Sequence, residues 1–182
     1  GARAADLLGA IERAGWDGGW YRRAFDDHGH VWGSAENIEC RIDSISQSWS
    51  VFAGADKIRS KVALEAAWQE LVDDKDHIAK LLWPAFDKTP RDPGYIKAYP
   101  PGIRENGGQY SHAAAWLGIA LARSGEPDKA MDVFKMLSPV GRVSDAEQAE
   151  TYLVEPYAVA ADIAGGDVHG GRGGWTWYTG AA

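Results

Sequence analysis

Cysteine is nearly absent from this chain of 182 residues, because Cys40 is the only one. No disulfide can form within the chain, which suits a reducing compartment, and we expect a cytoplasmic protein. No apolar run approaches the ~20 residues that a membrane-spanning helix needs. The first residues do not resemble a signal peptide. A longer parent protein could still be membrane-associated.

Positive charge is also scarce. The chain carries 19 Lys and Arg residues against 26 Asp and Glu residues, which gives a net charge of −7. No basic stripe follows any segment, so nucleic acid is excluded as an expected partner. Aromatic residues are plentiful instead, with nine tryptophans and seven tyrosines. Since aromatic faces stack on sugar rings as well as pack cores, this composition favours a carbohydrate ligand.

Several signature motifs are missing. The sequence has no phosphate-binding loop, no dinucleotide fingerprint and no nucleophile elbow, and no repeat of the kind that builds solenoids. No metal-ligand spacing stands out. His28 and His30 stand two residues apart beside Asp26 and Asp27, which we interpret as a solvated hairpin tip. We therefore expect neither a metal nor a cofactor.

Apolar spacing predicts a chain of helices joined by loops. Residues 20–32 are expected to form a β-hairpin, and residues 81–93 are expected to be irregular. Pro156 should interrupt the last helix. No parallel βαβ rhythm appears, so the expected class is all-α, a toroid of helix pairs with a small β-hairpin. The predicted helices are 4–14, 42–53, 57–72, 112–123, 127–137 and 148–164.

The stretch 94–112, GYIKAYPPGIRENGGQYSH, organises the chain. It holds two prolines and four glycines and runs into the apolar helical stretch AAAWLGIALA. Long loops held on rigid supports tend to carry function. Arg104, Glu105 and Asn106 together with His112 bring a cation, an anion and a histidine close to a helix start. The plainer alternative is a solvated connector with a buried His112.

Three other clusters are candidates. Glu39 and Asp43 precede a helix, where Asp43 is either an acid or an N-cap. Glu155 stands beside Pro156 at the helix break, and a structural salt bridge is its plainest role. Residues 171–174, followed by Thr179 and Gly180, offer backbone N–H groups of the kind that bind anions near a helix start.

Five segments, in order, resemble the C-terminal half of the catalytic domain of glycoside hydrolase family 94, and they cover almost the whole chain. That family contains cellobiose and chitobiose phosphorylases and the C-terminal region of cyclic β-1,2-glucan synthases. The third and fourth segments look more like the branch of cyclic glucan synthases and β-1,2-oligoglucan phosphorylases. The segments are WDGGWYRRAFDDHGHVWGS, ECRIDSISQSWSV, DPGYIKAYPPGIRENGGQYSHAAAW, VEPYAVAADI and GRGGWTWYTG.

The resemblance implies an (α/α)6 barrel with the active site at one end, which agrees with the helix-pair pattern. It also implies inverting phosphorolysis of a β-glucoside. Inorganic phosphate, as co-substrate, attacks the anomeric carbon while an aspartic acid protonates the glycosidic oxygen. Because phosphate is already anionic, no carboxylate base has to activate a water. Both ends of the chain look cut, so we expect residues 1–182 to be the C-terminal segment of such a catalytic domain.

By the family pattern, His112 binds phosphate, and Thr179 with the backbone N–H of Gly180 completes that pocket. Arg104 and Glu105 hold sugar hydroxyls close to the cleaved bond. These residue types suit the roles, since an imidazole, a hydroxyl and a main-chain N–H all donate to phosphate oxygens.

The sequence departs from the pattern at two places. The family's general acid lies upstream in an Asp-Trp-Asn-Asp-Gly type motif that this chain lacks. We therefore expect no catalytic residue here and an inactive segment. Ala160 and Ala161 stand where cellobiose-type members carry a glutamine, which argues against cellobiose-type specificity.

Two alternatives stay open at this point. One is a catalytically inactive carbohydrate-binding or scaffold piece. The other is an (α/α)6 hydrolase in which Glu39, Asp43 or Glu105 supplies the acid. The expected partners are a β-glucan oligosaccharide and phosphate. An isolated piece also leaves apolar helix faces uncovered, so we expect self-association or association with the rest of the barrel.

Overall fold

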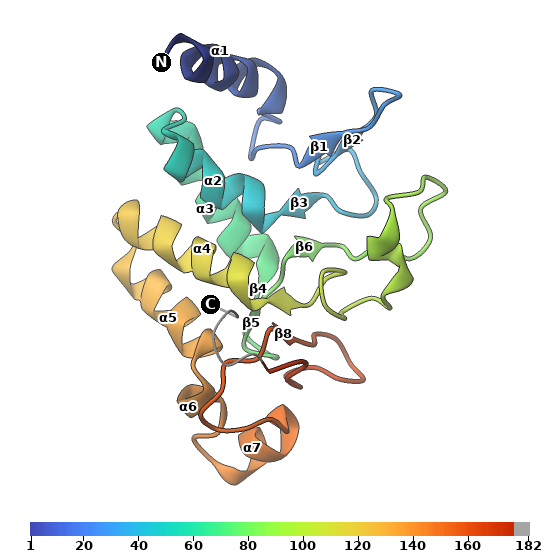
Figure 1. Ribbon diagram of the computed structural model, residues 1–182, viewed down its shortest axis with the longest axis vertical. Coiled ribbons are helices and arrows are strands. Elements are labelled where there is room, and N and C mark those ends of the chain that lie inside the picture. The colour runs from blue at the N-terminus through green and yellow to red at the C-terminus, as the bar shows by residue number, and fades with distance from the viewer. Residues whose placement is uncertain (177–182) are drawn as a thin grey trace.

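Four helices that lie side by side form the centre of the molecule, and short strands and long loops gather along one side of them (Figure 1). The computed structural model describes residues 1–176. The starts of α2 and α4 both meet the strands, so that side holds the N-termini of these two helices (Figure 1). The central helices are α2 (Ser44–Ala53), α3 (Lys57–Leu71), α4 (Ser111–Arg123) and α5 (Pro127–Leu137).

Local sequence signals explain where the central helices begin and end. The Asp43 carboxylate accepts a hydrogen bond from the Ile45 N–H at 2.8 Å, and Asp56 does the same for α3 at 3.0 Å. Such N-caps satisfy donors that a helix start leaves free. Gly54, at φ 73°, ends α2 in the left-handed conformation that glycine adopts easily. The predicted N-cap at Asp43 is therefore confirmed.

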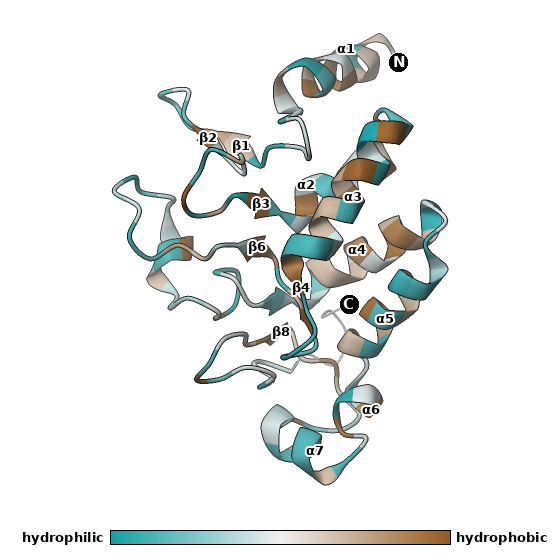
Figure 2. Ribbon diagram, turned by 180° about the vertical axis from the view of Figure 1, so that it is seen from behind, coloured by the Kyte–Doolittle hydropathy of each residue, from teal (hydrophilic) through white to brown (hydrophobic). Residues whose placement is uncertain are grey.

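The main core lies between α3, α4 and α5. Its central side chains are at most 2% exposed, and Gly118 lets α4 approach α5 closely, since a Cβ there would lie 3.3 Å from Val133 Cγ1. Brown apolar segments of these helices face one another in Figure 2. The central core residues are Leu64, Leu71, Leu117, Leu121 and Val133.

The strands are two residues long and pair as four separate antiparallel ribbons. The predicted hairpin at 20–32 is confirmed by the first pair. The ribbons are β1 (Ala24–Phe25) with β2 (Val31–Trp32), β3 (Ile42–Asp43) with β6 (Leu82–Trp83), β4 (Val72–Asp73) with β5 (Ile78–Ala79), and β7 (Gln109–Tyr110) with β8 (Asp162–Ile163).

Two predicted elements need correction at their edges. The helix predicted over 42–53 begins at Ser44, because Ile42 and Asp43 pair with β6 instead. The region 81–93, predicted as irregular, contains β6. Both errors have the same cause, since a two-residue strand leaves almost no periodic signal in the sequence.

The helix predicted over 148–164, with an interruption at Pro156, is right for residues 148–152 and wrong beyond them. The helix α7 spans Ala146–Tyr152 and stops at Leu153, which adopts a left-handed φ of 54°. Pro156 lacks the N–H that a continuing helix needs. The chain turns there, with the Ala158 N–H donating to the Glu155 carbonyl at 3.2 Å, and β8 then pairs with β7 to bury Ile163. A short helix α6 (Pro139–Arg142) precedes α7 and was not predicted.

The N-terminal segment packs lightly on the rest. The helix α1 (Ala2–Ala10) has no buried residue and continues into a wider turn, η1 (Ile11–Gly15). It agrees with the helix predicted over 4–14. The buried Gln47 amide fastens the following segment to α2, because it accepts from the Tyr21 N–H at 2.8 Å and donates to the Tyr21 carbonyl at 2.9 Å.

Candidate functional site

The loop that carries Arg104 and Glu105 is fixed from inside by Asn106. This side chain is fully buried, accepts a hydrogen bond from the Phe86 N–H at 2.7 Å and donates to the Phe86 and Tyr99 carbonyls at 2.8 and 2.7 Å. A buried amide with all of these partners holds a single conformation. Asn106 is thus a structural residue. The sequence did not show this, because Asn106 stands in a polar stretch next to candidate binding residues.

Arg104 is held in an uncommon backbone conformation with φ 49°. Its carbonyl accepts a hydrogen bond from the Gly108 N–H at 3.1 Å, and Gly102 donates to the Asn106 carbonyl at 2.8 Å. Residues other than glycine rarely adopt positive φ, and such positions cluster at functional sites. This tight turn places Arg104 and Glu105 side by side at the loop tip.

Glu105 and His112 both line one cavity of about 330 Å³. Glu105 comes from the loop and His112 from the first turn of α4. The hairpin segment adds a cation, Arg23, which the sequence reasoning did not single out. The lining residues are Arg23, Ile45, Leu81, Pro93, Tyr95, Ile96, Glu105, Tyr110, His112, Ala113 and Trp116.

His112 is exposed, not buried, so the plainer alternative of a packed core histidine is wrong. Its ring lies 4.4 Å from the Trp116 ring, one helical turn away. The helix start is tied down by Ser111, whose N–H donates to the Ala161 carbonyl at 3.0 Å and whose Oγ donates to the Ala160 carbonyl at 2.5 Å. The N-terminus of this 13-residue helix favours negative charge near His112.

Arg104 does not line that cavity. Its Nε lies 3.6 Å from Glu105 Oε2, which is too long for a hydrogen bond. Its guanidinium carbon lies 5.2 Å from the Tyr99 ring and 5.5 Å from the Trp175 ring, within the range of cation–π attraction. Arg104 Nε and Glu105 Oε2 are buried and have no hydrogen-bond partner among residues 1–176.

Two residues assigned to phosphate, Thr179 and Gly180, lie outside the described residues. The glycine-rich segment before them does not form the predicted anion site. All four of its N–H groups donate to backbone carbonyls, at 2.8–3.0 Å. These donors are Gly171, Arg172, Gly173 and Gly174.

Glu39 and Asp43, two of the three carboxyls named for the hydrolase alternative, have structural contacts. Glu39 accepts hydrogen bonds from the Lys88 and Thr89 N–H groups. Burial opposes ionisation there, but these backbone donors outweigh it and lower the pKa of Glu39. Asp43 is 1% exposed, and its two oxygens are taken by Ile45 and Arg23. Neither carboxyl is placed to donate a proton to a ligand.

Two candidates remain, the histidines of the hairpin turn and Glu155. His30 Nδ1 lies 2.8 Å from Asp26 Oδ2 within the hairpin turn, and residues 1–176 contain no group of three His, Cys, Asp or Glu side chains placed to hold a metal ion. Glu155 is exposed and forms no ion pair with a described residue, so its expected salt bridge is not found.

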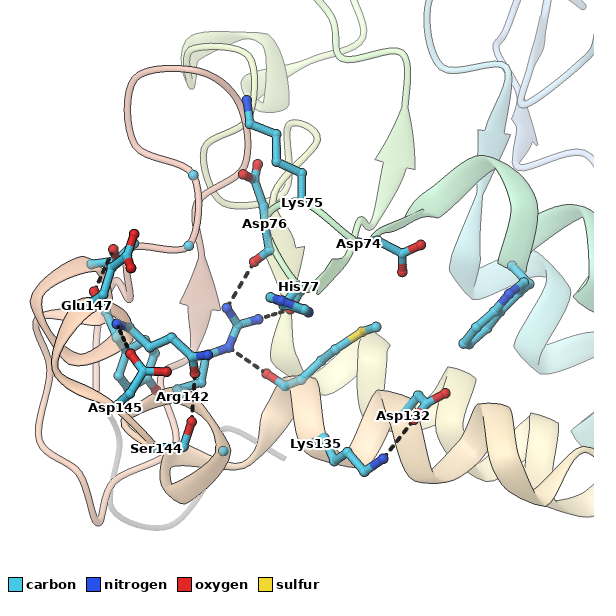
Figure 3. A pocket seen from close by; sticks show the side chains of 18 residues that line it. Asp74, Lys75, Asp76, His77, Asp132, Lys135, Arg142, Ser144, Asp145 and Glu147 are labelled. Atoms are coloured by element: carbon cyan, nitrogen blue, oxygen red, sulfur yellow. Dashed lines mark hydrogen bonds and ion pairs between the residues drawn. The ribbon is translucent and has the colours of Figure 1, made fainter.

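A larger cavity of about 760 Å³ lies at the end of the molecule near α6 and α7, and the sequence reasoning missed it. Figure 3 shows Arg142 among the residues that line this cavity, with its guanidinium bonded to the turn between β4 and β5. Its guanidinium donates to the carbonyls of Met136 and Asp76 at 3.0 Å each and to that of His77. Burial lowers the pKa of Arg142 to about 10. These three bonds make Arg142 a brace for the backbone.

Comparison with known proteins identifies the class of this chain. All of residues 1–182 match the catalytic domain of the glycosyl hydrolase 94 superfamily, and the chain belongs to that family. It is 55% identical over 177 residues to cyclic β-(1,2)-glucan synthase NdvB of Rhizobium meliloti, covering 97% of this chain and 6% of that protein. It is 30% identical to N,N'-diacetylchitobiose phosphorylase of Vibrio furnissii, covering 100% of this chain and 22% of that protein.

Solabiose phosphorylase of Paenibacillus borealis is also 30% identical, over 95% of this chain and 22% of its own length. The chain thus spans about a fifth or less of the curated relatives that it matches. Its relatives are carbohydrate-active enzymes of the phosphorylase and glucan synthase type. Within residues 1–176 there is no helix with the length and apolar character to cross a membrane.

Proposed function

We propose that this chain is the C-terminal part of an (α/α)6 catalytic domain that carries out inverting phosphorolysis of β-glucosides, with β-1,2-glucan as the substrate class. The observation that carries the proposal is that Glu105, from the loop, and His112, from the start of α4, line the same cavity. Membership of the family and the 55% identity to a cyclic β-(1,2)-glucan synthase support it. Inorganic phosphate is the co-substrate.

The first role in the proposal is phosphate binding by His112. Its exposed imidazole stands in the first turn of α4, where the helix dipole favours an anion. Thr179 and the Gly180 N–H complete the pocket by resemblance alone. Such donors orient phosphate toward the anomeric carbon and offset its charge without adding a fixed cation in direct contact.

The second role is sugar binding by Arg104 and Glu105. A sugar hydroxyl can donate to the buried Glu105 Oε2 and accept from the buried Arg104 Nε–H, both of which lack a partner among residues 1–176. An unpaired buried polar atom is costly, so a ligand or water that pairs with both gains binding energy. The general acid is supplied from outside this chain.

Replacing His112 with alanine tests the phosphate assignment. The KM for inorganic phosphate is measured from initial rates in the longer enzyme that carries this segment, as wild type and as His112→Ala, with a β-1,2-linked glucan as substrate. Loss of one charge-assisted hydrogen bond is worth roughly 1.5–3 kcal/mol, so the KM for phosphate should rise about ten- to a hundred-fold. The KM for the glucan should stay unchanged.

His28→Ala is the matched control, because His28 is an exposed histidine at the hairpin tip. It should leave the KM for phosphate at the wild-type value. If His112→Ala lowers only the melting temperature and leaves the KM for phosphate unchanged, the phosphate assignment is wrong.

A further inference from the structure

Asp162 is a buried carboxylate beside the candidate sugar-binding residues that neither the sequence reasoning nor the resemblance assigned. It lies in β8, is 5% exposed and stands opposite Tyr110 of β7, which lines the cavity. Its Oδ1 is buried without a hydrogen-bond partner among residues 1–176. Three of the six such side-chain atoms belong to Asp162, Arg104 and Glu105.

The backbone at Ala161 and Asp162 is hydrogen-bonded to the segment of Gly174 and Trp175. The Gly174 N–H donates to the Asp162 carbonyl at 2.8 Å, and the Ala161 N–H donates to the Trp175 carbonyl at 2.5 Å. The Gly174 backbone lies so close to the carboxylate that a Cβ there would meet Asp162 Oδ2 at 2.4 Å. Only glycine allows this approach, so the two residues are matched to each other.

Trp175 connects Asp162 to Arg104. The Trp175 indole lies 5.5 Å from the Arg104 guanidinium carbon, and its backbone N–H stabilises the ionised form of Asp162. One residue therefore contacts the carboxylate through its backbone and the cation through its ring.

The charges of the cluster act on one another. Burial is the largest influence on Asp162 and raises its pKa above the ordinary value. The positive charge of Arg104 and the Trp175 N–H oppose this increase, and the negative charge of Glu105 adds to it. The Arg104 guanidinium thus lies beside Glu105, with 3.6 Å between Nε and Oε2, and its charge also acts on Asp162.

We propose that Asp162 is a positioning residue that, through Trp175 and its own charge, holds the Arg104 guanidinium beside Glu105. The proposal rests on the proposed function in one respect only, namely that Arg104 and Glu105, held in this arrangement, contact sugar hydroxyls. Asp162 itself need not contact substrate.

The first test measures the coupling in the 182-residue chain without any ligand. The Asp162 carboxyl is titrated by ¹³C NMR in the wild type, Arg104→Gln and Glu105→Gln. Removing the guanidinium should raise the pKa of Asp162, and removing the neighbouring carboxylate should lower it. Asp162→Asn should shift the Arg104 Nε–H and Trp175 indole signals.

Asp73→Asn is the matched control, because Asp73 is a partly buried carboxylate paired with Lys80 at 2.7 Å, in a different ribbon. It should leave the Arg104 and Trp175 signals unmoved. If the two titration shifts are absent, or if Asp162→Asn leaves the Arg104 Nε–H signal in place, Asp162 does not position Arg104. If Asp162→Asn does not fold, the titrations in the other two variants decide.

The second test uses the longer enzyme that carries this segment. Asp162→Asn should raise KM for the glucan about ten-fold, by weakening hydrogen bonds to charged groups, and leave KM for phosphate unchanged. His112→Ala should show the opposite pattern. Should the wild type bind no glucan, the proposed function fails, while the ligand-free titrations still decide the role of Asp162. An unchanged glucan KM together with positive titrations would confine Asp162 to a structural role.

Discussion

At the residue scale, the motif drew attention to the loop of residues 94–112 but did not show which of its members are structural. Arg104, Glu105 and Asn106 are consecutive, yet Asn106 is fully buried and braces Phe86 and Tyr99. Whether a polar residue is structural or available to a ligand depends on its burial. A short polar stretch of sequence does not show which of its residues are buried. Asp162 escaped notice for the converse reason, because it sits among apolar residues in AVAADI.

The buried charge of Asp162 predicts a stability gain when it is removed. Its pKa is raised in the folded chain. Between the ordinary aspartate pKa of about 3.9 and that raised value, the folded state binds more protons than the unfolded state. The contribution of Asp162 to the free energy of unfolding of the wild type therefore increases as the pH falls through this window. Above the window, the folded wild type carries the full cost of a buried charge.

Asp162→Asn removes this pH dependence. We expect its melting temperature at pH 7 to equal or exceed that of the wild type, with the difference shrinking as the pH falls toward 4. Thermal melts of both proteins across that range measure the difference directly, and contributions from other carboxylates cancel. A variant that is less stable at pH 7 and no better at low pH would show that the raised pKa is not the dominant effect.

At the element scale, the central helices could be predicted and the short ribbons could not. The helix predicted over 127–137 matches α5, and the one over 57–72 matches α3 within a residue. Apolar periodicity and caps are local signals. The strand β8 depends on pairing with β7, more than 50 residues earlier, so the segment 158–164 looked helical until its partner was known.

The contact between α4 and α5 gives an element-scale prediction. Gly118 faces Val133 with no room for a larger side chain. Gly118→Leu should force the helices apart and lower the free energy of unfolding by about 1–3 kcal/mol, as overpacking does. Urea denaturation followed by circular dichroism measures the change.

Ala122→Leu is the control on the same helix, because Ala122 is exposed. It should change the free energy of unfolding by less than about 0.5 kcal/mol. Since leucine favours a helix more than glycine does, propensity alone would make Gly118→Leu more stable. An unchanged or increased free energy of unfolding in Gly118→Leu would therefore contradict the close packing at Gly118.

At the scale of the whole molecule, the central helices leave large apolar side chains exposed. Large side chains are uncovered on three of them: Ile58 of α3 is 78% exposed, Phe134 of α5 63% and Ile119 of α4 48%. The helix α1 buries nothing. Exposed apolar faces of this kind mark contact surfaces, and we propose that they pack against the rest of the barrel or, without it, against another copy of the chain.

The chain alone should therefore be inactive on β-glucosides. The loop holds two sugar-binding candidates and α4 holds His112, but the chain has no Asp-Trp-Asn-Asp-Gly type motif to protonate the leaving sugar. General acid assistance is worth about 10²–10⁴ in rate. An incomplete cavity also fails to orient the substrate, and this orientation supplies much of the remaining rate enhancement. Release of glucose 1-phosphate from β-1,2-glucan, measured with the 182 residues alone, should stay at background.

Light scattering on the same sample should show a species larger than 19.7 kDa, because exposed apolar faces favour association. Activity should appear only when the remainder of the domain is present, in the same polypeptide or added as a separate one. Clear turnover by a monomer of the isolated chain would place the acid within these residues and overturn the assignment of the general acid to another segment. Of the carboxylates considered, Glu105 would then be the candidate, since it alone lines the cavity.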